Sequence, residues 1–308
     1  MRSLLLWAAR EPRLRDTIPR MRFAQRAVRR FMPGERTEDA FAAAGRLQDE
    51  RNGVLFTRLG ENITALAEAD EVAAHYSGVL EADVERGHSQ GVVEISIKPT
   101  QLGLDQDAEA CYEHCDRLAT LCAKSGTWFW LDMEGSDYTE ATVALTERLL
   151  RAHDNIGVAL QAYLKRTAAD IERLLPGGPA IRLVKGAYDE PQDIAYRDAG
   201  AVDANYQALA VVIAEAAGRG QARLALGTHD VGLIERVSTI AEARGVDRAA
   251  LEVHMLYGIR EDQLRRLRDE GYPTSSLVAY GPAWYAWYMR RLAERPANVI
   301  FALRQMLP

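Results

Sequence analysis

Short apolar runs alternate with amphipathic helical stretches along the chain from residue 53 onward. The runs are rich in Val, Ile, Leu and aromatic residues, and near-continuous apolarity of this kind is typical of parallel strands covered on both faces. They recur at roughly the spacing of a βα unit, about thirty residues. The eight runs are 53–60, 91–99, 127–134, 155–163, 180–188, 222–230, 251–258 and 274–282.

This rhythm predicts an α/β protein built as a closed (βα)8 TIM barrel, because eight such units fit into about 250 residues. The alternative is an open doubly wound sheet, which would carry a G-x-G-x-x-G turn after a strand. No such turn follows any of the eight runs. We expect residues 51–308 to form the barrel domain and residues 1–50 to form an N-terminal helical arm.

The first 31 residues of this arm are basic and amphipathic, with acids at Glu11 and Asp16 and without a small-residue cleavage site after a long apolar core. A transit peptide is therefore disfavoured. Two interpretations stay open and can coexist: an arm packed on the barrel, and a peripheral contact with a membrane surface.

Composition narrows the class of protein. The 308 residues carry a formal net charge of -6, which argues against a general nucleic-acid surface. No run of eighteen apolar residues occurs, so no membrane-spanning helix is expected. Three cysteines, at 111, 115 and 122, lie on one helical stretch, and we expect them to be free and buried, in a cytoplasmic protein.

Polar residues fall at or near the ends of the apolar runs. In a (βα)8 barrel these ends meet at one mouth, where the chemistry of such barrels lies. In chain order they are Glu61, Lys98, Asp132, Gln161, Arg182, Lys185, Thr228, His229, His254 and Tyr280. Structural roles are open for several: Asp132 could pair with Lys98 or Arg182, and His254 could be a core histidine. Without a metal-binding His spacing, we expect no metal site.

The segment after the last run, "WYAWYMRR" (284–291), predicts a final helix in which Trp284, Trp287 and Arg291 share one stripe. Arg290 lies about 100° around the axis from Arg291. If this helix crosses the barrel mouth, the two guanidiniums suit a carboxylate or phosphate. The alternative is a solvent pair between Arg290 and Glu294.

Several of these segments together resemble the proline dehydrogenase family, in its short bacterial form. The matching motifs are "ISIKPTQLG", "LDME", "ALQAYLKRT", "RLVKGAY", "THD", "LYGI" and "YGPAWYAWYMRRLAERPANV", in the family's order over about residues 54–298. The resemblance implies a distorted (βα)8 barrel that holds FAD, with the final helix over the flavin at the barrel mouth.

The resemblance also implies roles for individual residues. Arg290, Arg291 and Lys98 would hold the carboxylate of proline, with Tyr280 and Leu256 against its ring. Asp132 would orient Lys98, and Arg182 would lie beside flavin N5, so these two are the candidate catalytic residues. The implied FAD contacts are Met133, Gln161, Arg182, Val184, Lys185, Gly186, Ala187, Thr228 and His229. His254 departs from the resemblance, because glutamine is expected at its position.

The implied reaction is oxidation of L-proline to 1-pyrroline-5-carboxylate by hydride transfer from C5 to FAD N5. A membrane quinone would accept the electrons, with the protein in the cytoplasm and in peripheral contact with the inner face of the cell membrane. Two other functions stay open: a Schiff-base aldolase with Lys98 or Lys185 as nucleophile, and a non-catalytic anion-binding module that uses the two arginines.

Overall fold

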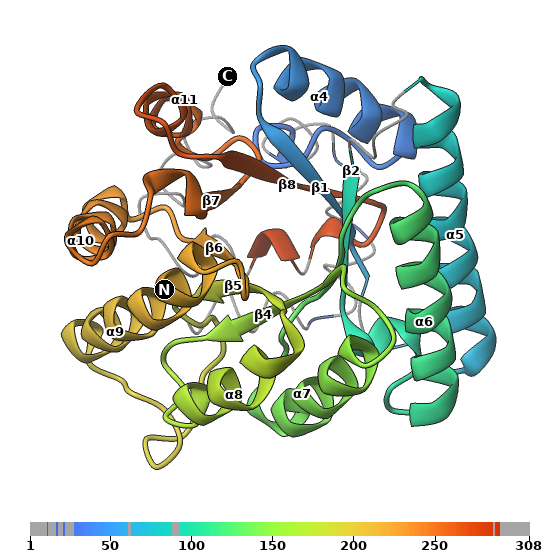
Figure 1. Ribbon diagram of the computed structural model, residues 1–308. Helices are drawn as coiled ribbons and strands as arrows, with labels where there is room; N and C mark the ends of the chain where they lie inside the picture. Colours follow the sequence, from blue (N-terminus) through green and yellow to red (C-terminus); the bar gives the residue numbers. More distant parts are fainter. Residues whose placement is uncertain are drawn as a thin grey trace.

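The structure is a computed structural model, and it describes residues 11, 17, 21, 28–60, 63–87, 93–285 and 287–289. Eight parallel strands close into a barrel in the order β1 to β8, with helices around the outside (Figure 1). Closure is direct, because Val54 of β1 pairs with Val93 of β2 on one side and with Ser276 of β8 on the other. The predicted (βα)8 barrel is confirmed.

The strands fall within the eight predicted runs or overlap them closely. They are β1 (Gly53–Arg58), β2 (Val93–Ile97), β3 (Phe129–Leu131), β4 (Ile156–Gln161), β5 (Ala180–Val184), β6 (Arg223–Gly227), β7 (Leu251–Leu256) and β8 (Thr274–Tyr280). The helices are α4 (Thr37–Asp49), α5 (Leu66–Glu85), α6 (Ala108–Lys124), α7 (Ser136–Leu150), α8 (Thr167–Leu174), α9 (Ala199–Gly218), α10 (Val231–Ala243) and α11 (Glu261–Asp269), with short 3-10 turns at Pro99–Leu102, Leu175–Gly177 and Arg248–Ala250.

Strand alternation divides the apolar residues into two clusters. One side of each strand packs under the helices in the main core, which includes Phe56 and Val278. The other side points into the barrel, where Leu55, Trp130 and Ala225 form a separate cluster. Successive side chains of a strand point to opposite faces, so neighbouring residues such as Leu55 and Phe56 belong to different layers. The side chains that point into the barrel include the polar residues of the candidate active site described below.

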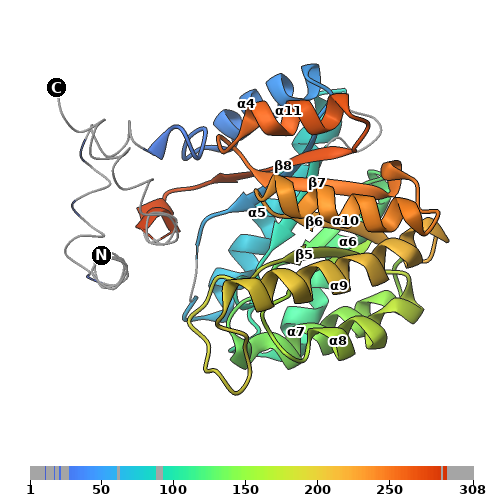
Figure 2. The same cartoon turned by 90° about the vertical axis from the view of Figure 1, so that its left-hand side faces the viewer.

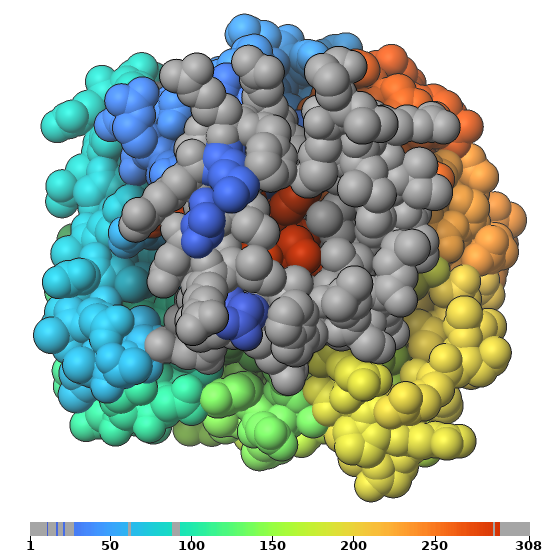
Figure 3. Space-filling view, turned by 180° about the vertical axis from the view of Figure 1, so that it is seen from behind, coloured from blue at the N-terminus to red at the C-terminus, as the bar shows by residue number. Residues whose placement is uncertain are grey.

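The described part of the N-terminal region packs on the barrel. Helix α4 contributes Phe41, whose ring meets that of Phe56 edge-on at 5.2 Å. Residues 28–32 pack with the segment after β8 in a third cluster, and Trp284 Nε1 donates to Glu35 Oε1 at 2.9 Å. Figure 2 places both segments at the same end of the barrel, and Figure 3 shows described residues near both chain ends on one face.

Two further findings concern the described residues alone. Among them no helix combines the length and apolarity that a membrane crossing needs. The three cysteines, Cys111, Cys115 and Cys122, are free and buried on α6, as expected. Burial raises the pKa of the Cys115 and Cys122 thiols well above their ordinary value, so these two side chains act as core residues rather than nucleophiles.

Candidate active site

A cavity of about 680 Å³ opens at the carboxyl ends of the strands. Its charged lining residues come from six of the eight strand ends and the turns that follow them: Arg58, Lys98, Asp132, Arg182, Lys185, Asp230 and Arg260. Five are basic and two are acidic, a net formal charge of +3 in a chain whose total is -6. The cavity therefore favours an anionic ligand.

The structure brings most of the predicted site residues together in this cavity. Those that line it are Lys98, Asp132, Met133, Gln161, Arg182, Val184, Lys185, Gly186, Ala187, Thr228, His229 and Leu256. His254 lines it as well. Arg290, Arg291 and Glu61 lie outside the residues that the structure describes. The proposed guanidinium pair over the mouth therefore stays a prediction.

Arg182 is held at the floor of the cavity by a buried ion pair. Its Nη2 donates to Asp132 Oδ1 and, at 2.8 Å, to Ser96 Oγ, which in turn donates to Asp132 at 2.9 Å. The guanidinium carbon lies 5.1 Å from the centre of the Trp130 ring. Nη1 of Arg182 is buried and has no hydrogen-bond partner within the described part of the chain. A buried donor of this kind calls for an acceptor in the cavity.

Lys185 forms ion pairs with two carboxylates. Its Nζ lies 2.5 Å from Asp203 Oδ1 and 2.9 Å from Asp230 Oδ2. Burial alone would lower the pKa of Lys185, but the hydrogen bonds to both carboxylates together outweigh burial and raise it. Lys185 therefore stays protonated near neutral pH. A Schiff-base nucleophile needs the opposite, a neutral amine, so this geometry disfavours the aldolase alternative at Lys185.

Two glycines let backbone approach closely around the cavity. Gly186, which follows β5, has φ +123°, and a Cβ there would meet the Tyr163 ring at 2.3 Å. A Cβ on Gly227, at the end of β6, would meet a Val184 methyl at 2.8 Å. Both positions therefore require glycine, which keeps the rim at β5 and β6 lined by backbone.

Gln161, Thr228 and His229 are fixed by local hydrogen bonds. Gln161 Nε2 donates to the Glu134 carbonyl at 2.9 Å. The amide of Leu256 donates to His229 Nε2 at 3.1 Å, so the proton of the neutral His229 ring is on Nδ1. Arg260 donates to the carbonyl of the same histidine at 2.9 Å. These bonds join the ends of β6 and β7 into one wall of the cavity.

The structure does not bring Tyr280 to the cavity. Alternation along β8 turns its side chain outward, where it is 1% exposed and meets Phe56 at 5.6 Å between ring centres. Its hydroxyl lies 2.7 Å from His75 Nε2 of α5. Contact with a substrate would require this ring to leave its place, so that role remains a prediction which the observed packing does not support.

His75 is expected to make stability depend on pH. Burial first, and then the charge of Arg58, lower its pKa from 6.5 to about 4. Between those values the unfolded chain binds the proton and the folded chain does not, so stability falls as pH drops from 6.5 towards 4. The ring is partly exposed, so we expect about 1–2 kcal/mol from this residue.

Urea unfolding at pH 7 and pH 5, for the wild type and His75→Gln, measures this contribution. The wild type should lose more stability than the variant over this interval, because glutamine does not titrate. Equal losses in the two proteins would contradict the assignment.

Sequence reasoning missed two of the cavity cations, Arg58 and Arg260. Arg58 is the last residue of β1, whereas the apolar run predicted Glu61, three residues further on, as its polar end. Arg260 lies in the turn before α11 with a left-handed backbone, φ 53°. Looking for polar residues at strand ends identifies Arg58 once the end of β1 is known. It does not identify a turn residue such as Arg260, which lies beyond the strand.

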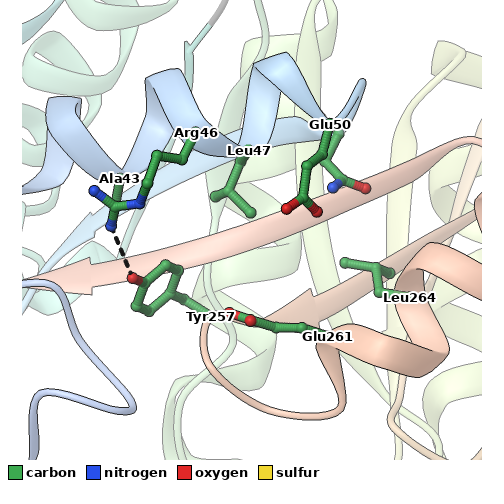
Figure 4. Close-up of a pocket in the computed structure, with 8 residues that line it drawn as sticks. Ala43, Arg46, Leu47, Glu50, Tyr257, Glu261 and Leu264 are labelled. Carbon is green, nitrogen blue, oxygen red and sulfur yellow. Dashed lines mark hydrogen bonds between the residues drawn. The ribbon is translucent and has the colours of Figure 1, made fainter.

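A smaller cavity, about 120 Å³, lies between α4 and α11 (Figure 4). Arg46 of α4 donates to the Tyr257 hydroxyl at 3.2 Å across it. Tyr257 follows Leu256 directly, so this bond links α4 to the wall of the main cavity. Within the described residues, no group of three or more His, Cys, Asp or Glu side chains is arranged to hold a metal ion.

The fold and the cavity define a (βα)8 barrel with a cationic ligand site at its catalytic mouth. Residues 40–304 match the family described as proline dehydrogenase. The chain is 32% identical over 282 residues to "Proline dehydrogenase 1" of Bacillus subtilis (strain 168), covering 91% of this chain and 90% of the relative. It is 34% identical over 287 residues to "Proline dehydrogenase" of Deinococcus radiodurans, covering 90% and 89%. The chain belongs to the proline dehydrogenase family.

Solved structures agree on the fold. Proline utilization A (PutA) from Bdellovibrio bacteriovorus, inactivated by N-propargylglycine, superposes with a TM-score of 0.80 at 20% identity. The match covers 94% of this chain but only 38% of that longer chain. Likeness at this identity shows the barrel fold alone, so the site residues rest on the geometry described above.

Proposed function

We propose that this chain oxidises L-proline to 1-pyrroline-5-carboxylate with FAD bound in the cavity at the barrel mouth. Membership of the proline dehydrogenase family supports the substrate and the reaction class. The observation that supports the rest of the proposal is the buried Arg182, which is held by Asp132 and whose Nη1 has no partner among the described residues. An aromatic ring with acceptor atoms would satisfy that donor.

The residues present fit FAD in three respects. The cavity has a volume of about 680 Å³, within the range of small-molecule and cofactor sites. Its net formal charge of +3 suits a pyrophosphate. Gly186 and Gly227 line the cavity, and neither has room for a Cβ beside Tyr163 or Val184, so both present bare backbone to a flat ring.

The proposed contacts follow the family resemblance, and they are supported by the presence of these residues in the cavity lining. Arg182 and Gln161 would meet the flavin ring, with Met133 and the run Val184, Lys185, Gly186 and Ala187 beside it. Thr228 and His229 would meet the dinucleotide's phosphate and adenosine parts. When bound, FAD supplies N5 as the acceptor of the hydride that leaves C5 of proline.

The chain's own residues bind and orient the substrate. Lys98 at the cavity rim and, in our proposal, Arg290 and Arg291 hold the proline carboxylate, because these cations match its charge. Asp132 fixes the Arg182 guanidinium through a direct bond and through Ser96. Leu256 gives the pyrrolidine ring an apolar wall that keeps water out. Positioning of this kind supplies much of an enzyme's rate.

The proposed electron acceptor is a membrane quinone, reached by a cytoplasmic protein in peripheral contact with the inner face of the cell membrane. Its support is the family resemblance and the basic, amphipathic sequence of the first 31 residues.

An absorbance spectrum of the purified protein, before and after anaerobic addition of L-proline, tests the function. We expect a flavin spectrum that bleaches with L-proline and is unchanged by L-alanine, which lacks the ring. Bleaching should be faster at higher pH, because C5 oxidation needs the neutral amine of proline. A protein without flavin that instead gains mass after borohydride reduction with a carbonyl substrate would establish the aldolase alternative.

A further inference from the structure

A polar cluster fills the barrel below the cavity floor. Arg223 of β6 donates to both carboxylate oxygens of Glu252 on β7, from Nε at 2.8 Å and from Nη2 at 3.0 Å. Its Nη1 donates to Glu94 of β2 at 2.8 Å. The indole nitrogen of Trp130 donates to the same Glu94. Each buried charge in this cluster therefore has an opposite charge beside it.

His254 joins this cluster through one ring nitrogen. Its Nε2 lies 2.9 Å from Glu252 Oε1, which also accepts from Ser275 Oγ at 2.7 Å. Burial would raise the pKa of Glu252, but the charges of His254 and Arg223 and the bonds from His254 and Ser275 together hold it far below its usual range. Glu252 is therefore an ionised acceptor, and Nε2 of His254 carries a proton. This bond fixes the orientation of the imidazole.

The second ring nitrogen of His254 has no bonding partner among the residues that the structure describes. Nδ1 is buried and lacks a hydrogen-bond partner within the described part of the chain. The residue is 3% exposed, yet it lines the main cavity. Other buried side-chain atoms of the described residues also lack a partner, but among them only Arg182 Nη1 and His254 Nδ1 belong to residues that line this cavity. A ligand bound in the cavity can therefore supply the missing partner of Nδ1.

Arg182 and His254 form a matched pair of such residues. Both lie next to Trp130, with the guanidinium carbon 5.1 Å and the imidazole centre 5.5 Å from its ring. Each is held by a carboxylate group, Asp132 for Arg182 and Glu252 for His254. Each has one buried nitrogen without a partner among the residues described. The floor therefore offers two hydrogen-bonding atoms, from β5 and from β7, beside one indole.

We propose that His254 is a cofactor-binding residue, whose Nδ1 forms a hydrogen bond with the polar edge of the FAD ring system at the cavity floor. This inference rests on the proposed function, because it takes FAD as the ligand. Glu252 acts as a positioning residue that holds Nε2 and so presents Nδ1.

Nitrogen NMR of protein labelled with 15N-histidine tests the contact directly. We expect the Nδ1 resonance of His254 to move when FAD is added to the FAD-free protein, while Nε2 stays protonated. The chain has six histidines, and the spectrum of His254→Gln identifies the resonances of interest. If FAD binds and proline bleaches it while Nδ1 of His254 is unmoved, the inference fails and the proposed function stands. If the wild type binds no FAD, both fail.

FAD affinity, measured by fluorescence titration, gives a second readout. His254→Leu should weaken FAD binding about tenfold, the loss of one hydrogen bond, and His254→Gln should recover most of it. Folding is expected to survive in both variants, because Glu252 keeps its bonds from Arg223 and Ser275. The control is His153→Leu, which removes a histidine bonded to Asp116 outside the cavity lining. Unchanged FAD affinity in His254→Leu would overturn the inference.

Discussion

Arg182→Met is expected to reduce kcat/KM for proline about a thousandfold or more. The substitution removes the only positive charge bonded to Asp132 within the described residues and leaves that carboxylate beside an apolar side chain. It also removes Nη1, a buried donor of a cavity-lining residue that has no partner among the described residues. Loss of one preorganised donor alone costs about 100- to 1000-fold in catalysis, and the unpaired charge adds to that. Steady-state kinetics with a dye acceptor measure the effect.

Two other variants separate catalysis from folding. Arg182→Lys retains a positive charge for Asp132 but lacks the second amino group, so we expect it to fold well and to remain strongly impaired. Arg173→Met breaks surface pairs with Glu140 and Glu147 on the outside of the barrel. Exposed pairs contribute about 1 kcal/mol or less, so its kinetics should match the wild type. Near-normal activity in Arg182→Met would remove Arg182 from the site.

The barrel was predictable because its strands are buried on both faces. Each strand appears as one short apolar run, and all eight observed strands lie within the predicted runs. The convergence of Lys98, Asp132 and Arg182 was also predictable, since carboxyl ends of parallel strands meet at one rim. Neither prediction required knowledge of a contact between residues that are distant in the sequence.

Side-chain direction was not predictable from the same runs. A strand that is apolar on both faces does not reveal which residues point inward, so Tyr280 was assigned to the cavity although the strand turns it towards His75. The partner of Asp132 was left open between two cations, and the fold selects Arg182. The cluster of Glu94, Arg223 and Glu252 joins three strands far apart in sequence, which no local pattern indicates.

The inner layer of the barrel also explains why one strand residue must be glycine. Gly157 of β4 lies against the face of Trp130, and a Cβ there would come within 2.3 Å of the indole. The indole has little room to move, because Arg182 and His254 pack next to it and Glu94 holds its nitrogen. Trp130 is therefore the fixed support of the cavity floor, and Gly157 provides the space it occupies.

Gly157→Ala is accordingly expected to destabilise the protein by about 3 kcal/mol, the upper end of the usual cost of overpacking a core. The matched control is Gly78→Ala in α5, where a Cβ meets nothing within 4 Å. That change should stabilise the protein by up to about 1 kcal/mol, because alanine favours a helix interior. Urea unfolding of the two variants beside the wild type measures both effects.

The same substitution should also impair the cavity, because a displaced indole moves its two neighbours, Arg182 and His254. FAD affinity should fall in Gly157→Ala under conditions where the variant is still fully folded, and it should be unchanged in Gly78→Ala. If the two variants unfold at the same urea concentration and bind FAD equally, Trp130 is not the rigid floor that the packing indicates. The two hydrogen-bonding atoms beside it would then be positioned by their carboxylate partners alone.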